Sequence, residues 1–292
     1  MNLAHGQGFY RWRPAACLKV IGEDALTFLQ GQFTNDLHQA GKGGAIYGLW
    51  LNQKGKVLAD SFVRKISERD WRVVSYFSPA SVIRERLVAY IVADDVVIED
   101  VTESTMGVTL LGAVTAAEMG LDASAWEFPG RRMPELHTEL LFPAAIEFEV
   151  SAKLAGGILL SPDEMERKRI AAGIPAVPVD IGPADLPNEG GLEVEAISYT
   201  KGCYLGQEVM ARLKSMGQVR RRLVRVHGRG EPPARPAALF QAARKVGELR
   251  SAAREGAEWS GLAMVSLVQL NRETGIALTP DGAPVAKLAD LP

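Results

Sequence analysis

Apolar residues along the first third of the chain recur with two different periods. Spacings of three and four residues predict amphipathic helices over residues 22–37 and 82–91. Two apolar segments meet at residues 52–55, where asparagine and glycine predict the turn of a hairpin. A further strand pair is expected at residues 57–66 and 71–76. Short strands and helices thus follow one another without the regular alternation of a doubly wound sheet, which indicates an α+β fold.

The middle of the chain carries clear start and stop signals. Ser161 and Pro162, followed by two acidic residues, are typical of a helix start, because serine caps free N–H groups and acids favour the positive end of the helix dipole. Gly173 is the expected end of this helix. Four prolines in residues 175–187 argue against a helix or a central strand there. A shorter helix is expected to begin near Gly202.

The sequence changes in character near residue 219. Short apolar segments at residues 223–227 and 263–270 are separated by glycine and proline breaks, which predicts a small β-barrel of about 70 residues. We therefore expect a region of two modules at residues 1–218 and a terminal barrel domain at residues 219–292. A length of 292 residues fits this division into about two domains.

Composition and charge narrow the class of protein. The chain is 47% hydrophobic and 23% charged, with a formal net charge of −2, as in ordinary globular domains rather than in disordered chains. No apolar run approaches the roughly 18 residues needed to cross a bilayer, and the N-terminal residues lack the apolar segment of a secretory signal. The sequence therefore predicts a soluble, cytoplasmic protein with no membrane partner.

Cysteine and histidine usage argues against a resident metal. Cys17 and Cys203 are too few for a disulfide framework, or for the roughly four thiolates of an iron–sulfur cluster. The histidines lie far apart, without the short spacings of metal ligands; they are His5, His38, His137 and His227. We expect no intrinsic metal site.

Residues 201–208 carry the one concentrated chemical signal. They read Lys-Gly-Cys-Tyr-Leu-Gly-Gln-Glu and place Cys203 at the expected helix start, where free N–H groups, the helix dipole and Lys201 would stabilise a thiolate. Gly202 and Gly206 would let other groups approach the backbone closely. Cys203 is therefore a candidate reactive or ligand-contacting thiol with Lys201 beside it, or else a small residue packed at a tight helix entry.

This segment resembles the signature of a known family. It matches the K-G-C-[aromatic]-x-G-Q-E pattern of the YgfZ family, which are folate-binding proteins related to the aminomethyltransferase (T-protein) of the glycine cleavage system. The matching residues are Lys201, Gly202, Cys203, Tyr204, Gly206, Gln207 and Glu208. The resemblance extends to residues 25–37, 55–60, 246–249 and 261–263, and so covers nearly the whole chain.

The resemblance implies a fold, a ligand and a role. The fold is α+β and T-protein-like, with intertwined α/β modules around a central channel and a C-terminal β-barrel. The ligand is tetrahydrofolate or a one-carbon derivative, bound inside the channel. The role is the assembly, repair or maintenance of iron–sulfur enzymes, including one that methylthiolates tRNA. The implied partners are accordingly iron–sulfur client enzymes or assembly proteins.

The resemblance also implies which residues contact the folate. Asp60 follows Ala59 where T-proteins carry paired aspartates, and a carboxylate there would polarise the reacting nitrogen or one-carbon unit. Because alanine replaces one acid, glycine-cleavage chemistry is not expected, and Asp60 either contacts folate or caps the hairpin. Glu189 either accepts N–H groups of the pterin ring or is a solvated loop acid. Tyr204 and Gln207 complete the predicted contacts.

Two other functions compete with this interpretation. Residues 209–230 carry seven positive charges and no acid, which would suit tRNA or other nucleic-acid phosphates, or the polyglutamate tail of folate. Few aromatic residues follow Tyr204, so stacking on single strands is not indicated. The second competitor is a folate-dependent aminomethyl- or methyltransferase that acts on a small amine. A scaffold with a structural Cys203 is the plainest alternative.

Overall fold

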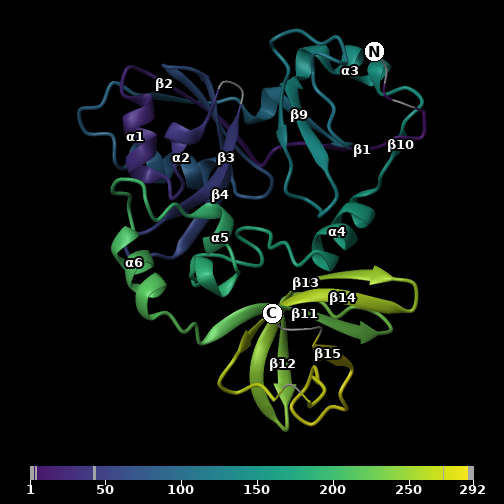
Figure 1. Ribbon diagram of the computed structural model, residues 1–292. Helices are drawn as coiled ribbons and strands as arrows, with labels where there is room; N and C mark the ends of the chain where they lie inside the picture. Colours follow the sequence, from purple (N-terminus) through teal and green to yellow (C-terminus); the bar gives the residue numbers. More distant parts are fainter. Residues whose placement is uncertain (1–2, 4, 42–43, 272, 289–292) are drawn as a thin grey trace.

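The computed structural model describes residues 3, 5–41, 44–271 and 273–288 (Figure 1). Their strands form three five-stranded sheets. Two of these sheets lie in the upper half of Figure 1 and the third, formed by the C-terminal residues, lies below them. The predicted α+β class is confirmed, and the segment between residues 160 and 217 connects the two halves.

The first sheet is built from the apolar segments of residues 16–100. Its strands are antiparallel to their neighbours and pair in the order β3-β4-β5-β2-β6. Two helices pack their apolar side chains into its core, where Trp71 and Leu29 are fully buried. The strands are β2 (Ala16–Ile21), β3 (Ala45–Leu51), β4 (Val57–Ser67), β5 (Asp70–Ser75) and β6 (Val97–Asp100), and the helices are α1 (Ala25–Gln32) and α2 (Ala80–Val88).

The hairpin between β3 and β4 is confirmed, whereas the first predicted helix was too long. The Asn52 side chain accepts the N–H of Lys54 and of Lys56, which closes the turn. The helix predicted over residues 22–37 ends at Gln32, because the backbone of Phe33 turns to the extended conformation and bridges to Trp50 on β3. Burial of the Phe33 ring against Trp50 thus overrides the helical spacing.

The second sheet takes its strands from distant parts of the sequence. Its order is β10-β1-β7-β9-β8, so the first strand of the chain pairs with strands that follow the whole first sheet. The helix α3 (Glu147–Lys153) lies at the top of this part in Figure 1. The strands are β1 (Gly8–Trp12), β7 (Thr105–Leu111), β8 (Trp126–Pro129), β9 (His137–Pro143) and β10 (Ile158–Leu159).

Aromatic side chains join the first two sheets. Phe62 of β4 lies 4.5 Å from Phe128 of β8, measured between ring centroids. Trp12 of β1 lies 5.2 Å from Tyr76, which directly follows β5. These rings belong to one buried cluster with residues of both sheets. The seam is therefore a continuous aromatic core, and it fixes the two sheets relative to each other.

The connecting segment contains three helices, α4 (Pro162–Ala171), α5 (Glu193–Ala196) and α6 (Gln207–Met216). The predicted start of α4 is confirmed, since Ser161 and Glu164 form a reciprocal capping box. The predicted start of α6 near Gly202 was wrong by five residues. Gly206, with a φ of +87°, is the residue before the first turn. None of the described helices is long and apolar enough to cross a membrane.

The terminal sheet curls around its own core, in which Trp259 lies against Gly228. Its order is β12-β13-β14-β11-β15, with all pairs antiparallel. The strand predicted at residues 263–270 ends earlier, at Ser266. The strands are β11 (Arg221–Arg229), β12 (Ala237–Gln241), β13 (Arg244–Glu255), β14 (Glu258–Ser266) and β15 (Ala286–Leu288).

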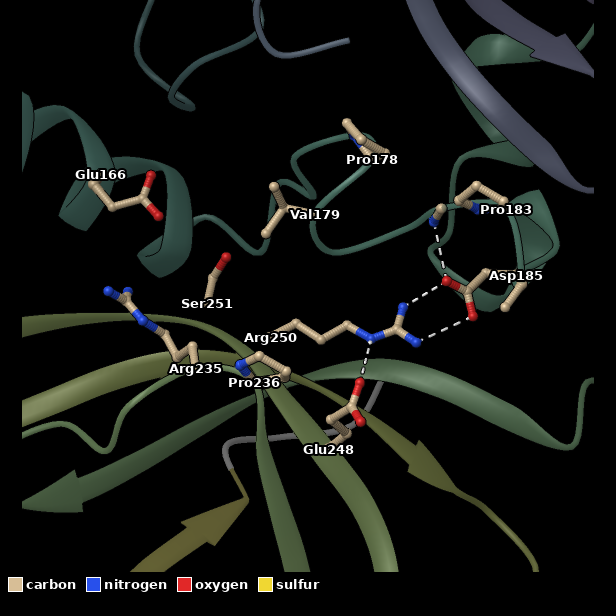
Figure 2. Close-up of a pocket in the computed structure, with 12 residues that line it drawn as sticks. Glu166, Pro178, Val179, Pro183, Asp185, Arg235, Pro236, Glu248, Arg250 and Ser251 are labelled. Carbon is tan, nitrogen blue, oxygen red and sulfur yellow. Dashed lines mark hydrogen bonds and ion pairs between the residues drawn. The ribbon is translucent and has the colours of Figure 1, made fainter. Parts of the chain in front are cut away.

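An ion-pair network ties the connecting segment to the terminal sheet. Asp185, almost fully buried, pairs with Arg221 of β11 at 3.2 Å and with Arg250 of β13 at 2.5 Å. Arg250 also pairs with Glu248 and borders a cavity of about 510 Å³, shown in Figure 2. A single carboxylate thus binds two barrel strands, and we name Asp185, Arg221 and Arg250 the barrel clamp.

Candidate functional site

Asp60 lies on β4 at the seam between the first two sheets. The residue is only 5% exposed, and its carboxylate accepts hydrogen bonds from three side-chain hydroxyl groups. Ser78 and Ser75 donate to Oδ1 at 2.7 and 2.9 Å, and Tyr47 donates to Oδ2 at 3.0 Å. Because a carboxylate oxygen can accept two hydrogen bonds, Oδ2 keeps room for one further donor.

Burial raises the pKa of Asp60. Loss of solvent raises the pKa of this carboxyl above its usual 3.8, while the hydroxyl groups of Ser78 and Ser75 and the charge of Arg131 oppose the rise. A buried carboxylate with a raised pKa, held by fixed hydroxyl groups, is suited to accept or share a proton with a ligand nitrogen. Asp60 is therefore the centre of the candidate site.

Arg131 brings a third segment to Asp60. It lies in the turn between β8 and β9, and its guanidinium carbon is 4.6 Å from the ring centroid of Tyr47. Its Nε donates to Glu195 of α5 at 2.7 Å. The backbone N–H of Arg131 donates to the hydroxyl of Tyr76 at 3.2 Å. Residues from both upper sheets and from the connecting segment thus meet around Asp60.

The residue before Asp60 faces the opposite side of β4. Ala59 is fully buried in the apolar core beneath α1 and α2, next to residues such as Trp50. Successive side chains of a strand alternate between faces, so a carboxylate at position 59 would enter this core. A second acid at position 59 would therefore lie in this core and not beside Asp60.

Lys201 donates hydrogen bonds to the C-terminal end of α1 and not to the thiol of Cys203. Its Nζ donates to the backbone carbonyls of Gln30, Phe33 and Asn35 at 2.7, 2.6 and 3.0 Å. These carbonyls lie at and just beyond the C-terminus of α1, where orphan acceptors and the helix dipole favour a cation. Burial lowers the pKa of Lys201 to about 8.

Cys203 is exposed and lies four residues before the first residue of α6. The helix-terminus argument for a stabilised thiolate therefore does not apply in this structure, because the free N–H groups of α6 begin after Gly206. Cys17, by contrast, is buried on β2, and burial raises the pKa of its thiol. Of the two cysteines, Cys203 is the one that solvent and ligands can reach.

The rest of the signature docks the connecting segment onto the β3–β4 hairpin. Tyr204 is buried with residues of that hairpin, and its hydroxyl has no hydrogen-bond partner. A side chain at Gly206 would lie 3.0 Å from the carbonyl oxygen of Asn52. Gln207 begins α6 and is half-buried, and Glu208 is exposed in the first turn. Glycine is thus needed at Gly206 by both its φ and its close contact.

Glu189 is buried in a short 3₁₀ turn and is already paired. Arg221 donates to its Oε1 at 2.9 Å and to its Oε2 at 2.8 Å, and the N–H of Leu186 donates to Oε2 at 2.7 Å. The residue borders a hollow of about 860 Å³ between the connecting segment and the terminal sheet. It is therefore not a solvated loop acid, but its carboxylate offers little free acceptor capacity.

Part of the basic segment of residues 209–230 is used within the molecule. Arg221 binds Glu189 and Asp185, and Arg225 donates to the carbonyl of Ala171 at 2.7 Å. Arg229 pairs with Glu258. These contacts reduce the charge available to nucleic acid, so the structure gives this alternative no additional support. The seven positive residues are Arg212, Lys214, Arg220, Arg221, Arg222, Arg225 and Arg229.

The structure brings some predicted residues together and separates others. Within the described ranges no hydrogen bond or ion pair joins Asp60, Glu189 and Cys203 to one another. Tyr47 and Tyr204 share one apolar cluster, which links the Asp60 site to the signature. Sequence reasoning missed Tyr47 and Arg131, because neither lies in a motif.

Comparisons with known proteins define the class. The GCVT N-terminal domain model matches residues 12–126, and the CAF17 C-terminal β-barrel domain model matches residues 220–287. The fold is similar to that of aminomethyltransferase T of the glycine cleavage system from Bartonella henselae, with a TM-score of 0.80 at 17% identity over 98% of this chain and 85% of that one. The chain thus has the fold of this aminomethyltransferase, with one segment similar to the GCVT N-terminal domain and one similar to the CAF17 C-terminal barrel.

Its curated relatives narrow the class further. The human iron–sulfur cluster assembly factor IBA57 is 30% identical over 228 residues, which are 70% of this chain and 62% of the relative. The tRNA-modifying protein YgfZ of Blochmanniella pennsylvanica is 24% identical over 230 residues, 72% of this chain and 68% of the relative. The chain thus spans about three fifths to two thirds of these relatives, and its resemblance to the YgfZ family is confirmed.

Proposed function

We propose that this protein binds a reduced folate, tetrahydrofolate or a one-carbon derivative, and supports the assembly, repair or maintenance of iron–sulfur enzymes, tRNA-modifying ones included. The names of its relatives, an iron–sulfur cluster assembly factor and a tRNA-modifying protein, support the second half of this proposal. Its partners would be iron–sulfur client enzymes or assembly proteins in the cytoplasm.

The observation that carries the folate proposal is the state of Asp60. Its buried carboxylate keeps one free acceptor position on Oδ2, beside the aromatic rings of Tyr47 and Phe62. A reduced pterin is a flat ring edged with N–H groups, so a carboxylate with a free acceptor position beside an aromatic side chain matches it. When bound, the folate would supply one-carbon or reducing chemistry, and Asp60 would orient it by accepting an N–H.

Glu189 takes a secondary place in this proposal. Arg221 already occupies both of its carboxylate oxygens, so Glu189 can accept one further N–H but not two. Tyr204 and Gln207 shape the wall between the signature and the hairpin. We therefore assign the first contact to Asp60 and a supporting contact to Glu189.

Calorimetric titration with tetrahydrofolate under anaerobic conditions tests the binding step. We expect saturable heat with the wild type and a loss of affinity of about tenfold or more in Asp60→Asn, because one charge-assisted hydrogen bond is weakened. Asp281→Asn, an exposed aspartate on a turn, is the matched control and should bind like the wild type. No heat with folded wild type at millimolar ligand would refute the proposal.

Cys203 remains the candidate reactive thiol of this function. Because Cys203 is exposed and Cys17 is buried, iodoacetamide should label Cys203 first in the native protein. Slower labelling in the presence of tetrahydrofolate would place the thiol near the ligand. In cells, Cys203→Ala should impair iron–sulfur enzymes while Cys17→Ala should not, provided that both variants accumulate as folded protein. Full complementation of a deletion strain by Cys203→Ala would make the thiol structural.

A one-carbon transferase is the second candidate. The observation behind it is Asp60, a buried acid held by Ser78 that this part of β4 presents to the site. Turnover of one-carbon forms of tetrahydrofolate in the presence of small amines tests it. If the protein binds folate but turns over no amine, the maintenance of iron–sulfur enzymes remains as the only one of the two proposed functions.

A further inference from the structure

A cavity of about 380 Å³ lies between the first and second sheets, and none of the side chains that bind Asp60 lines it. Phe142 of β9 and Trp126 of the neighbouring strand β8 form a buried apolar wall. Cys17 of β2 lines the buried side of the cavity, and Ile66, which is 44% exposed, lies at its mouth. Cavities of this size hold small organic molecules.

The strand register places this cavity at the opposite end of the seam from Asp60. Asp60, Phe62 and Arg64 are alternate residues of β4, so their side chains lie on one face of the first sheet. Phe62 belongs to the aromatic core of the seam. Arg64 is opposite Arg72 of β5, which is opposite Lys19 of β2, and both Arg72 and Lys19 line the cavity. The packed rings of the seam therefore separate this cavity from the Asp60 site.

Three cationic side chains thus occupy opposed positions on neighbouring strands. Like charges directly opposite each other destabilise a sheet. Asp70 accepts a hydrogen bond from Arg72 at 3.1 Å, and the carboxylate of Glu99 lies 3.6 Å from the ammonium of Lys19. Arg64 donates to a backbone carbonyl, and its Nε is buried without a partner. Two paired carboxylates accompany three cations, and a sheet that keeps such an arrangement is suited to bind a further anion.

Lys19 has the free donors at this cavity. Its side chain is 35% exposed, and within the ranges that the structure describes it forms an ion pair with Glu99 but donates no hydrogen bond. Among the described residues, no acid lines the cavity. Cys17 does not repel an anion at neutral pH, because burial raises the pKa of its thiol and keeps it uncharged. The cavity therefore combines an apolar aromatic wall with a cationic edge.

We propose that this cavity binds a small aromatic carboxylate, with its ring against Trp126 and Phe142 and its carboxylate at Lys19, beside Arg72. Aromatic contacts hold the ring, and charge-assisted hydrogen bonds from the ammonium hold the acid. The ligand contacts both sheets and therefore stabilises their seam when it binds. This site is separate from Asp60 and does not depend on the proposed folate binding.

The test compares two probes by calorimetric titration of the full chain. The probe 2-naphthoate carries a carboxylate, and 2-naphthamide has the same rings without the charge. We expect the wild type to bind the carboxylate more tightly, and Lys19→Gln to reduce the ratio of the two affinities by about threefold to tenfold, because one charge-assisted contact is lost. Lys65→Gln is the matched control and should leave the ratio unchanged. Lys65 lies on the other face of the same sheet, where it pairs with Glu68.

A second variant tests the location without removing a cation. Ile66→Glu places an acid at the exposed mouth of the cavity, so it should repel the carboxylate and lower the same ratio. Val88→Glu is its control, since Val88 lies on α2 with a similar exposed fraction of 46%. A wild type that binds neither probe at millimolar concentration, or binds both equally, would overturn this inference. An unchanged ratio in Lys19→Gln or Ile66→Glu, or an equal fall in Lys65→Gln, would also overturn it.

Discussion

At the scale of single residues, the burial that would suit Asp60 for the proposed folate contact also costs stability. Its carboxylate is buried among hydroxyl groups, and burial raises its pKa above 3.8. The folded state therefore holds the proton more tightly than the unfolded state does. The stability that protonated Asp60 contributes is present below pH 3.8 and is lost as the pH rises through the folded-state pKa.

Asp60→Asn should remove this pH dependence. Asparagine can accept from Ser75 and Ser78 and can donate to Tyr47, so the local hydrogen bonds survive. We expect the variant to gain stability relative to the wild type between pH 4 and pH 7, while it loses folate affinity. Urea unfolding at several pH values measures the difference. A stability difference that does not change with pH would contradict the assigned role of burial.

Lys201→Met should destabilise the protein by about 2–4 kcal/mol. The variant leaves the carbonyls of Gln30, Phe33 and Asn35 without their shared cationic donor, and hydrogen bonds to charged groups are stronger than neutral ones. The midpoint of denaturant unfolding measures this. The rate at which iodoacetamide labels native Cys203 should stay the same. A large fall in that rate with unchanged stability would restore Lys201 as the partner of the thiol.

At the scale of elements, the two glycines of the signature have different roles. Gly206 has a φ of +87° and lies against Asn52, so the start of α6 depends on it. Gly202 is exposed, and a side chain there would meet nothing within 4 Å. The docking of α6 on the hairpin is therefore specified at one of these two positions.

Gly206→Ala should cost about 1–2 kcal/mol, because a left-handed backbone strains an L-residue. Gly202→Ala, its matched control within the same motif, should change the free energy of unfolding by less than about 0.5 kcal/mol. Thermal unfolding of the two variants under the same conditions measures these two changes in stability. Equal losses would show that the helix entry differs from the one described.

The elements that the sequence predicts well are those fixed by local interactions. Ser161 and Glu164 cap α4 through neighbours in sequence, and Asn52 closes its own hairpin turn. The start of α6 could not be read locally, since it depends on the contact of Gly206 with the hairpin. Arg131 was missed for the same reason. It lies in a loop, and only the folded seam brings its guanidinium group to the ring of Tyr47.

At the scale of the whole molecule, the barrel clamp connects the terminal sheet to the rest. Asp185 is almost fully buried and is the carboxylate that arginines of two barrel strands share. Without it, Arg221 keeps only Glu189 and Arg250 keeps only the more exposed Glu248 as carboxylate partners, and breaking a buried ion-pair network is destabilising. The terminal sheet should therefore become less stable and more independent when this residue changes.

Asp185→Asn should cost about 3–5 kcal/mol and make the barrel unfold before the remaining sheets. Differential scanning calorimetry should show two transitions where the wild type shows one. Glu248→Gln is the matched control. Glu248 also pairs with Arg250, and the side chain of Glu248 is 38% exposed. Removal of its charge should therefore cost less than about 1 kcal/mol. A single transition in Asp185→Asn would mean that apolar contacts alone couple the barrel.

The route of β1 constrains how this chain can be made and divided. A ribosome releases β1 (Gly8–Trp12) first, but its partners β7 and β10 emerge only after all five strands of the first sheet. During translation β1 therefore has no strand to pair with while the first sheet is synthesised. A fragment that stops at residue 126 would lack β9 and β10 and would leave the second sheet incomplete. The part matched by the GCVT model therefore does not contain a complete second sheet.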